Sequence, residues 1–276
     1  MLKNWLRNFQ GPFFALVFPL ISVWIMGSIV VSYTTSSSVP GQDNPLSHVF
    51  LSIIPSFIAL IIISVCMSSF TNQLIDFKTS VIIKRIGVSP ISKIHFFLAS
   101  YCFAIFLSFI STLWIVSVIE IFFHSDIYSQ AIVAQAHMLQ NFSSFLIFAL
   151  GWLLGIFVAT SISFWVTSIS NSQGKAIGII MLFFFPTMFL SGAQLPPSLI
   201  DHSPSLKIVS YFIPQRYAIQ VLYSGYFSSS FFGTPNETIK VIYQNSPIHA
   251  WHAAIIALSF SLLLSTWTFS TWKWEN

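Results

Sequence analysis

Few side chains in this 276-residue sequence could carry chemistry, and they do not combine into a catalytic motif. His249 and His252 share one helix face, but a metal site needs a third or fourth ligand, and no such residue is fixed beside them. Gly174 and Lys175 lack the upstream glycine and the following hydroxyl of a phosphate-binding loop. The zinc-protease, paired-cysteine and serine-hydrolase motifs are also missing. We therefore expect no catalytic residue, no metal ligand and no cofactor bound by this chain.

Glu120 is the one acidic residue clearly close to a long apolar stretch. An ionisable residue inside a membrane is costly and is often functional. Two interpretations remain open. Glu120 is either a solvated helix end, with Asp126 one or two turns beyond it, or a contact for a substrate or a proton on a transport pathway.

The composition indicates a protein that is solvated by lipid. Charged residues make up 7% of the chain and hydrophobic residues 55%, whereas soluble domains carry about 25% charged residues. So few charges cannot supply a surface that faces water. The 11 Lys and Arg residues are scattered rather than gathered into a basic patch, which argues against nucleic-acid binding.

Six stretches are long and apolar enough to cross a bilayer, which needs about 20 residues per helix. The gaps between charged residues place these spans at about 12–32, 49–70, 94–123, 142–169, 176–195 and 250–272. Tyr217–Phe232 is uncharged but too polar and too broken to be an ordinary seventh span. The expected fold is a single all-α integral membrane domain over residues 1–276.

Loop charges predict the orientation, because Lys and Arg accumulate in cytoplasmic loops. With six spans and a cytoplasmic N-terminus, eight basic residues lie inside: Lys3, Arg7, Lys78, Lys84, Arg85, Lys93, Lys175 and Lys273. The other three, Lys207, Arg216 and Lys240, fall in one long external loop. Both termini are therefore predicted to be cytoplasmic.

The loop between the second and third spans, residues 76–93, predicts a helix, an elbow and a second helix. Apolar residues recur there at helical spacing: Ile75, Ile82, Ile83 and Ile86. Gly87 suits the position just past a helix end, and Ser89 followed by Pro90 suits the start of the next helix. The local chemistry allows this elbow to lie on lipid headgroups or to dock into a groove of a partner.

The segment after the fifth span is interrupted by five prolines, at positions 186, 196, 197, 204 and 214. Proline removes a backbone donor and disfavours the interior of a helix, so one continuous helix is not expected. Short re-entrant or interfacial helices between the fifth and sixth spans fit the pattern, because broken backbone at membrane depth must be covered by protein or water. An ordinary ordered external loop is the alternative.

These segments resemble the permease subunits of ABC-2 type ABC transporters, which have the type V exporter fold. The lead-in Arg7, Pro12, Phe18 and Pro19 resembles the start of that family's first span. Its coupling-helix motif is matched by Lys84, Arg85, Ile86, Gly87, Val88, Ser89 and Pro90. Its signature after the fifth span is matched by Pro186, Ser191, Gly192, Pro196, Pro214 and Tyr217.

The resemblance implies a multi-pass subunit in the cell (plasma) membrane that pairs with a second permease, identical or homologous, to form a dimer. Each permease would sit on a separate ABC ATP-binding subunit, which binds ATP and Mg²⁺, and the loop 76–93 would dock there. The chain would therefore be a transport subunit, not an enzyme. It would export an amphipathic or hydrophobic substrate, such as a drug, an antibiotic, a peptide or a lipid-linked molecule.

Two other classes remain as alternatives. An ion-coupled secondary transporter or channel would need charges or broken helices near the middle of the bilayer, and only Pro186 and Gly192 hint at these. A membrane-embedded lipid-modifying enzyme would need acids, histidines or a nucleophile clustered at one membrane face, and the sequence lacks such a cluster.

Overall fold

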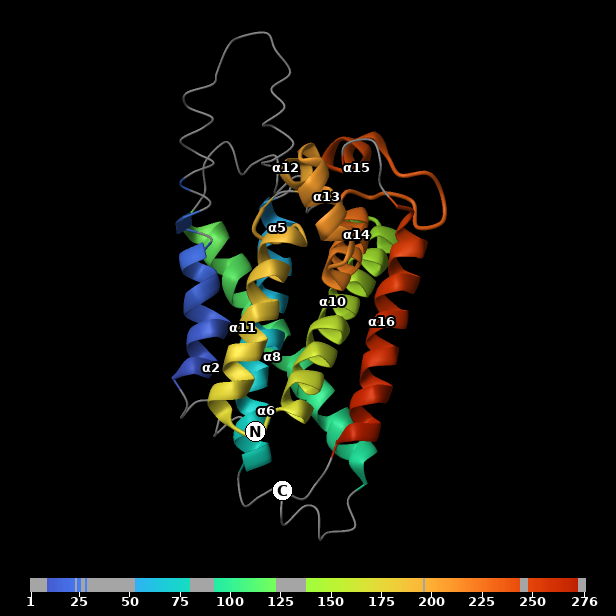
Figure 1. Ribbon diagram of the computed structural model, residues 1–276. Helices are drawn as coiled ribbons and strands as arrows, with labels where there is room; N and C mark the ends of the chain where they lie inside the picture. Colours follow the sequence, from blue (N-terminus) through green and yellow to red (C-terminus); the bar gives the residue numbers. More distant parts are fainter. Residues whose placement is uncertain are drawn as a thin grey trace.

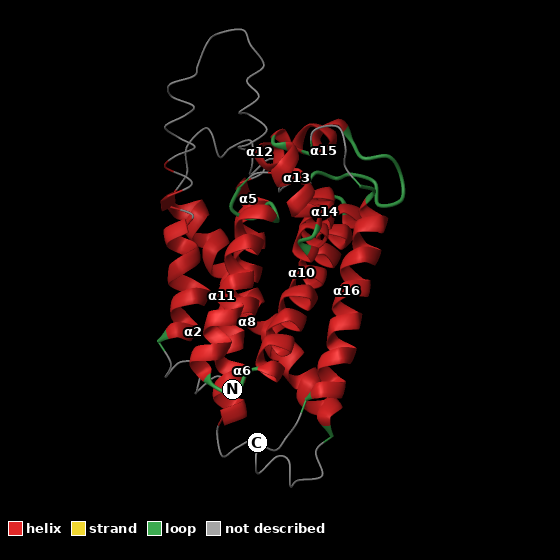
Figure 2. Ribbon diagram, in the orientation of Figure 1, coloured by secondary structure: helices red, strands yellow, loops and turns green. Residues whose placement is uncertain are grey.

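A computed structural model describes residues 9–22, 24, 25, 28, 53–79, 92–122, 138–195, 197–243 and 248–272. Throughout these residues the regular elements are helices, without strands, which agrees with the all-α prediction (Figure 2). In chain order they are α2 (Gln10–Pro12), η1 (Phe13–Val17), α5 (Ile53–Ile63), η2 (Ser64–Ser69), α6 (Phe70–Thr79), α8 (Lys93–Phe122), α10 (Phe142–Ile169), α11 (Gln173–Leu190), α12 (Pro197–His202), α13 (Pro204–Tyr211), α14 (Pro214–Tyr226), α15 (Glu237–Ile242) and α16 (Ala250–Thr271).

Within the described residues, five helices are long and apolar enough to cross a membrane: Ile54–Thr79, Lys93–Val118, Phe142–Ile169, Gln173–Leu190 and Ala250–Thr271. They correspond to the second to sixth predicted spans. The first predicted span is described only in part, as a shorter apolar helix over Phe13–Ser22. A total of six spans, and the cytoplasmic position of both termini, stay predictions.

The long helices stand side by side in one bundle, and the short helices α12 to α15 gather at one end of it (Figure 1). We call this end the short-helix end. At the opposite end α6 stops, α8 starts, and α10 and α16 stop, with Lys78 and Lys93 among their terminal residues. We call it the lysine end.

The helix of the second span runs further than predicted. Its expected end was residue 70, but it continues as α6 to Thr79, with a π-helical stretch at η2. The predicted bound marked the end of the apolar stretch, and the helix continues through the polar residues that follow it. No glycine or proline interrupts Thr71–Thr79, and Asn72 and Gln73 are buried against neighbouring helices instead of facing water.

The fifth span also differs from its predicted bounds of 176–195. Helix α11 begins at Gln173, where the Ser172 side chain accepts a hydrogen bond from the Lys175 backbone N–H, and it ends at Leu190. Pro186 lies inside α11, as it lay inside the predicted span. Proline removes its own N–H from the helical ladder, and its ring crowds the carbonyl four residues earlier, here that of Leu182.

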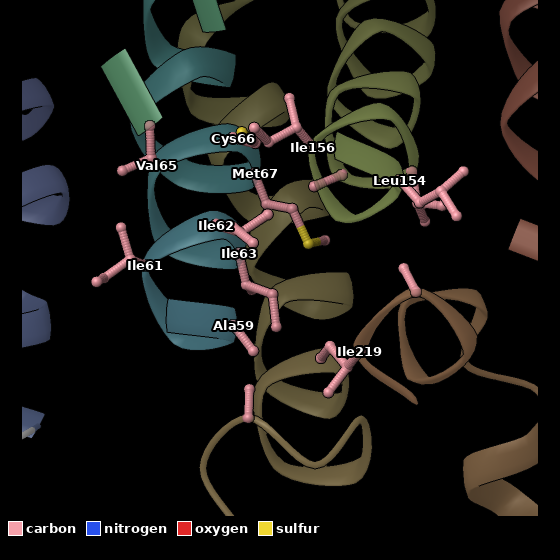
Figure 3. Packing of buried hydrophobic residues seen from close by; sticks show 14 of the residues in the cluster. Ala59, Ile61, Ile62, Ile63, Val65, Cys66, Met67, Leu154, Ile156 and Ile219 are labelled. Atoms are coloured by element: carbon pink, nitrogen blue, oxygen red, sulfur yellow. The ribbon is translucent and has the colours of Figure 1, made fainter. Parts of the chain in front are cut away.

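The helix formed by α5, η2 and α6 is the centre of the bundle. Its residues from Ile54 to Ile75 are buried, and it packs against η1, α8, α10 and α11. Figure 3 shows Ile63 and Met67 on the side that faces α10 and α14, while Ile61 and Val65 point the other way. A helix that is apolar on all sides needs such an enclosed position.

The outer helices leave large apolar side chains uncovered, including Leu98, Phe106, Leu113, Leu182, Phe185, Leu262, Leu263 and Trp267. These side chains come from α8, α11 and α16. Exposure of so large an apolar surface to water is unfavourable, whereas its contact with lipid or with another apolar protein surface is favourable. Together with the five long apolar helices, this surface indicates a membrane protein.

Candidate functional site

The predicted coupling elbow, Lys84–Pro90, lies outside the described residues. The structure describes the two helices that flank it: α6 ends at Thr79, and α8 begins at Lys93. The site can therefore be built from the residues that hold these two helix ends in place.

Lys78, in the last turn of α6, is bound to the end of α10. Its Nζ donates hydrogen bonds to the backbone carbonyls of Thr167 (2.9 Å), Ser168 (2.9 Å) and Ser170 (2.8 Å). The last carbonyls of a helix lack partners within the helix and carry partial negative charge. A single half-buried ammonium therefore joins α6 to the C-terminus of α10.

Lys93, the first residue of α8, makes the equivalent contact with α16. Its Nζ donates a hydrogen bond of 2.8 Å to the carbonyl of Trp272, the residue that follows the last turn of α16. The Trp272 ring is buried against Phe96, Phe97 and Phe164, with centroids 5.6–6.3 Å away. The Nζ of Lys78 also lies 5.8 Å from the centre of this ring, so the two lysines meet at one tryptophan.

The signature residues predicted after the fifth span lie at the short-helix end. Ser191 caps α11, and its backbone N–H binds the carbonyl of Thr187 at 3.1 Å. Gly192 follows with φ of +95°, a backbone conformation that side chains other than glycine rarely adopt. A Cβ at Gly192 would also lie 3.0 Å from Cγ of Pro197. Glycine therefore permits the turn that ends the helix and leads into α12.

The carbonyl of Gly192 lies within hydrogen-bond distance of two hydroxyls, those of Tyr223 on α14 (3.3 Å) and Ser56 on α5 (3.4 Å). The two hydroxyls are themselves 2.5 Å apart. This buried contact ties the end of α11 to the central helix and to α14.

The other signature residues begin and brace α14. Pro214 is the first residue of this helix, where a missing N–H costs nothing. The Tyr217 hydroxyl donates a 2.8 Å hydrogen bond to the carbonyl of Tyr211, at the end of α13. Pro196 lies outside the described residues. The structure thus brings Ser191, Gly192, Pro214 and Tyr217 to one end of the bundle, and Pro186 lies one turn before the end of α11.

A buried ion pair joins the short helices, and the sequence did not reveal it. Nη2 of Arg216 on α14 lies 2.6 Å from Oδ1 of Asp201 on α12, and both side chains are at most 3% exposed. Nη1 of Arg216 donates to the Ser210 hydroxyl at 2.6 Å. The guanidinium also lies 5.0 Å and 5.5 Å from the ring centres of Tyr211 and Tyr243. Burial raises the pKa of the Tyr243 hydroxyl well above its ordinary value, so this neighbour stays neutral.

Helices α10 and α14 touch through their backbones. A Cβ placed on Gly225 of α14 would lie 2.1 Å from the backbone nitrogen of Phe148, and one on Gly151 of α10 would lie 2.3 Å from that of Leu222. Gly151 and Gly155 form a small-xxx-small pair, which lets membrane helices approach closely. That spacing is the signal in the sequence that could have identified this contact.

Glu120 lies in the last turn of α8, which ends at Phe122. The predicted position near the end of the third span therefore agrees with the helix, while its side chain lies outside the described residues. The imidazole Nδ1 of His249 lies 3.0 Å from the carbonyl of Gly233. Within the described part of the chain, no three His, Cys, Asp or Glu residues come close enough to hold a metal ion.

The contacts at both ends join one helix to another across the bundle. At the lysine end they connect the helices beside the predicted elbow to α10 and α16. At the short-helix end they connect α14 to α5, α10, α11, α12 and α13.

Comparison with protein families gives a match over most of the chain. The family described as "ABC-2 family transporter protein" matches residues 22–271, which include both the predicted elbow and the short-helix end. Neither the search of curated proteins nor the search of solved structures found a match.

Proposed function

Since the chain belongs to the ABC-2 family of transporter proteins, and is thus a transmembrane permease of an ABC transporter, we propose that it works as an exporter. The predicted family resemblance is confirmed by the match over residues 22–271. In this proposal ATP hydrolysis on a separate subunit moves an amphipathic or hydrophobic substrate outward. A drug, an antibiotic, a peptide and a lipid-linked molecule all fit that class.

The family implies association with an ABC ATP-binding subunit. We assign the docking role to Lys84–Pro90, in the loop that joins α6 to α8. The sequence has no phosphate-binding loop of its own, which supports binding of ATP and Mg²⁺ on the partner. On this assignment the lysine end faces the cytoplasm, residues 1–276 form a single membrane domain, and both termini are inside.

A complete transporter would contain two permeases in the plasma membrane, either two copies of this chain or this chain and a homologue. The uncovered apolar side chains of α8, α11 and α16 offer surface for lipid and for such a second permease. When the two ATP-binding subunits close on ATP, they would press on the loops at the lysine end. The spans would then tilt and open a central pathway outward.

The substrate class rests on the character of the spans. Phenylalanine occurs 30 times and tryptophan nine times, and many of these rings lie on the helices of the bundle. Aromatic side chains combine large apolar surfaces with weakly polar faces and edges. A pathway between such helices suits a hydrophobic or amphipathic molecule better than a sugar or an ion.

The family match over nearly the whole chain is the observation that carries this proposal. The test is to co-express the chain with candidate ATP-binding subunits and to measure co-purification and vanadate-sensitive ATP hydrolysis. We expect hydrolysis to depend on this chain in the membrane. Scrambling Gly87–Pro90 should abolish co-purification, whereas replacing Lys175, an exposed lysine at the same end, by methionine should preserve it.

Two results would overturn the proposal. Transport by the chain alone, driven by an ion gradient without ATP, would indicate a secondary transporter. Turnover of a lipid substrate by the purified chain would indicate an enzyme. A scrambled chain that keeps its ATP-binding subunit would refute the docking assignment but not the family.

A further inference from the structure

Two lysines flank the connection from α6 to α8, and each is bound to the end of a different helix. Lys78 lies before this connection and binds three carbonyls at the end of α10. Lys93 lies after it and binds the carbonyl of Trp272 at the end of α16. The residues on both sides of the predicted elbow are thus hydrogen-bonded to other helices.

The chemistry of these contacts makes them strong. Hydrogen bonds from an ammonium to carbonyls are charge-assisted and roughly twice as strong as neutral ones. The C-terminal end of a helix adds attraction through its aligned peptide dipoles. Lys78 is half-buried, which further protects its three bonds from water. The Trp272 ring, packed on Phe96, Phe97 and Phe164, lies 5.8 Å from Nζ of Lys78, and the carbonyl of the same residue accepts the bond from Lys93.

The two helices that the lysines bind, α10 and α16, both contact a single helix towards the short-helix end. Both α10 and α16 pack along α14. The contact between α10 and α14 runs backbone to backbone at Gly151 and Gly225, so a shift of α10 cannot be absorbed by side chains there. Helix α14 is in turn bound to α12 and α13 through Arg216, Asp201 and Ser210.

We propose that Lys78 and Lys93 are positioning residues that transmit movement of the adjoining ends of α6 and α8 to α10 and α16, and through α14 to the short-helix end. This inference rests on the proposed function, because a docked ATP-binding subunit must supply the movement. A purely structural role would be to stop the ends of α10 and α16 from fraying. The two roles differ in their effect on a response to nucleotide at the far end of the molecule.

The experiment uses the chain in complex with its ATP-binding subunit in lipid nanodiscs. Ser205, an exposed residue of α13, is replaced by cysteine as a reporter. Labelling of this chain by a water-soluble maleimide is timed with ATP plus vanadate and without nucleotide. The chain without Ser205→Cys corrects for Cys66 and Cys102. The readout is the ratio of the two labelling rates, together with ATP hydrolysis.

In the parent chain we expect the two labelling rates to differ by about fivefold or more. In the double variant Lys78→Met/Lys93→Met the ratio of the two rates should return to about one. ATP hydrolysis should persist, since the docking loop is unchanged. Lys78→Arg/Lys93→Arg should restore most of the ratio, because arginine also donates to carbonyls. Lys175→Met, which removes an exposed lysine at the same end, should leave it unchanged. If the double variant does not fold, the two single variants provide the same test, each with a partial loss.

The outcomes separate this inference from the proposed function. A parent complex that hydrolyses ATP and responds at Ser205→Cys, with an equal response in the methionine variants, overturns the inference alone. A parent complex that hydrolyses ATP without any response at Ser205→Cys also overturns it, because no movement reaches the short-helix end. A chain that supports no ATP hydrolysis with any ATP-binding subunit overturns the proposed function, and the inference with it.

Discussion

The two ends of the bundle are held together by different chemistry. At the short-helix end, α10 and α14 touch through backbone atoms at Gly151 and Gly225, and an ion pair between Arg216 and Asp201 is almost fully buried. At the lysine end, the helices are joined through long side chains, those of Lys78 and Lys93, and through the Trp272 ring. Backbone contact leaves no slack, whereas a lysine side chain with four methylene groups can follow a small displacement.

The difference in burial predicts how strongly a substitution at each end lowers the stability of the fold. Removing one member of a buried ion pair leaves a charge with neither water nor a partner, which is strongly destabilising. A half-buried lysine that loses its carbonyls can still reach water. We therefore expect the short-helix end to determine the stability of the fold, and the lysine end to respond to what binds there.

The first and largest effect should follow the loss of Arg216. In Arg216→Met the carboxylate of Asp201 stays buried without its guanidinium, and the free energy of unfolding should fall by about 3–5 kcal/mol. The measurement is unfolding of the purified chain in detergent, followed by circular dichroism. The double variant Arg216→Met/Asp201→Leu, which removes both charges, should recover much of the loss. A double variant no better than the single one would show that the charge is not the cause.

The second effect tests the backbone contact. Gly225→Ala places a Cβ at 2.1 Å from the nitrogen of Phe148, so α10 and α14 must separate, at a cost of about 3 kcal/mol. Gly178→Ala on α11 is the matched control, because its Cβ would meet no atom within 4 Å. Alanine is a better helix former than glycine, so the control should keep or slightly raise the unfolding temperature. Equal losses in both variants would contradict the close approach.

The bounds of the third and fourth spans could be predicted from the sequence for a simple reason. Helix α8 contains neither glycine nor proline between Lys93 and Phe122, and α10 lies between two polar stretches, so the apolar stretches coincide with the helices. The end of the second span could not be predicted in this way. Its polar residues Asn72 and Gln73 are buried by neighbouring helices, and the sequence does not say what lies beside a residue.

The same distinction applies to the candidate site: features set by local sequence could be predicted, and contacts between distant residues could not. Local chemistry predicted short helices between the fifth and sixth spans, and Pro214 stands at the start of α14, a position that suits proline. The partner of Arg216 is 15 residues away on another helix, and no local pattern pairs the two. The contacts of Lys78 and Lys93 could not be predicted, because their acceptors are backbone carbonyls, which every residue has.

The third effect concerns the lysine end. Lys78→Met removes three charge-assisted hydrogen bonds from a half-buried site, and we expect a loss of about 1–2 kcal/mol in unfolding free energy. Salt should narrow the difference between Lys78→Met and the parent chain, because partly exposed charges are screened. The same comparison for Arg216→Met should change little, because that pair is buried. The measurement is the unfolding of both variants at low and at high salt. If Lys78→Met and Arg216→Met showed equal salt sensitivity, the proposed difference in burial between the two ends would be wrong.

The smallest effect belongs to a hydroxyl cluster between the two ends. The Tyr101 hydroxyl on α8 lies 3.0 Å from that of Ser161 on α10 and 2.8 Å from that of Ser265 on α16, and the two serines are 2.9 Å apart. In Tyr101→Phe the serines still bond to each other, and the ring keeps its contacts with Phe157 and Phe164. Hydrogen bonds between membrane helices average about 0.6 kcal/mol, so a loss of that order is expected in detergent unfolding. Thr266→Ala is the control, because the exposed Thr266 hydroxyl bonds only within α16, to the carbonyl of Leu263. A loss at Tyr101 as large as that at Gly225 would mean that side-chain bonds in the middle of the bundle, and not the contacts at its short-helix end, hold α10 in place.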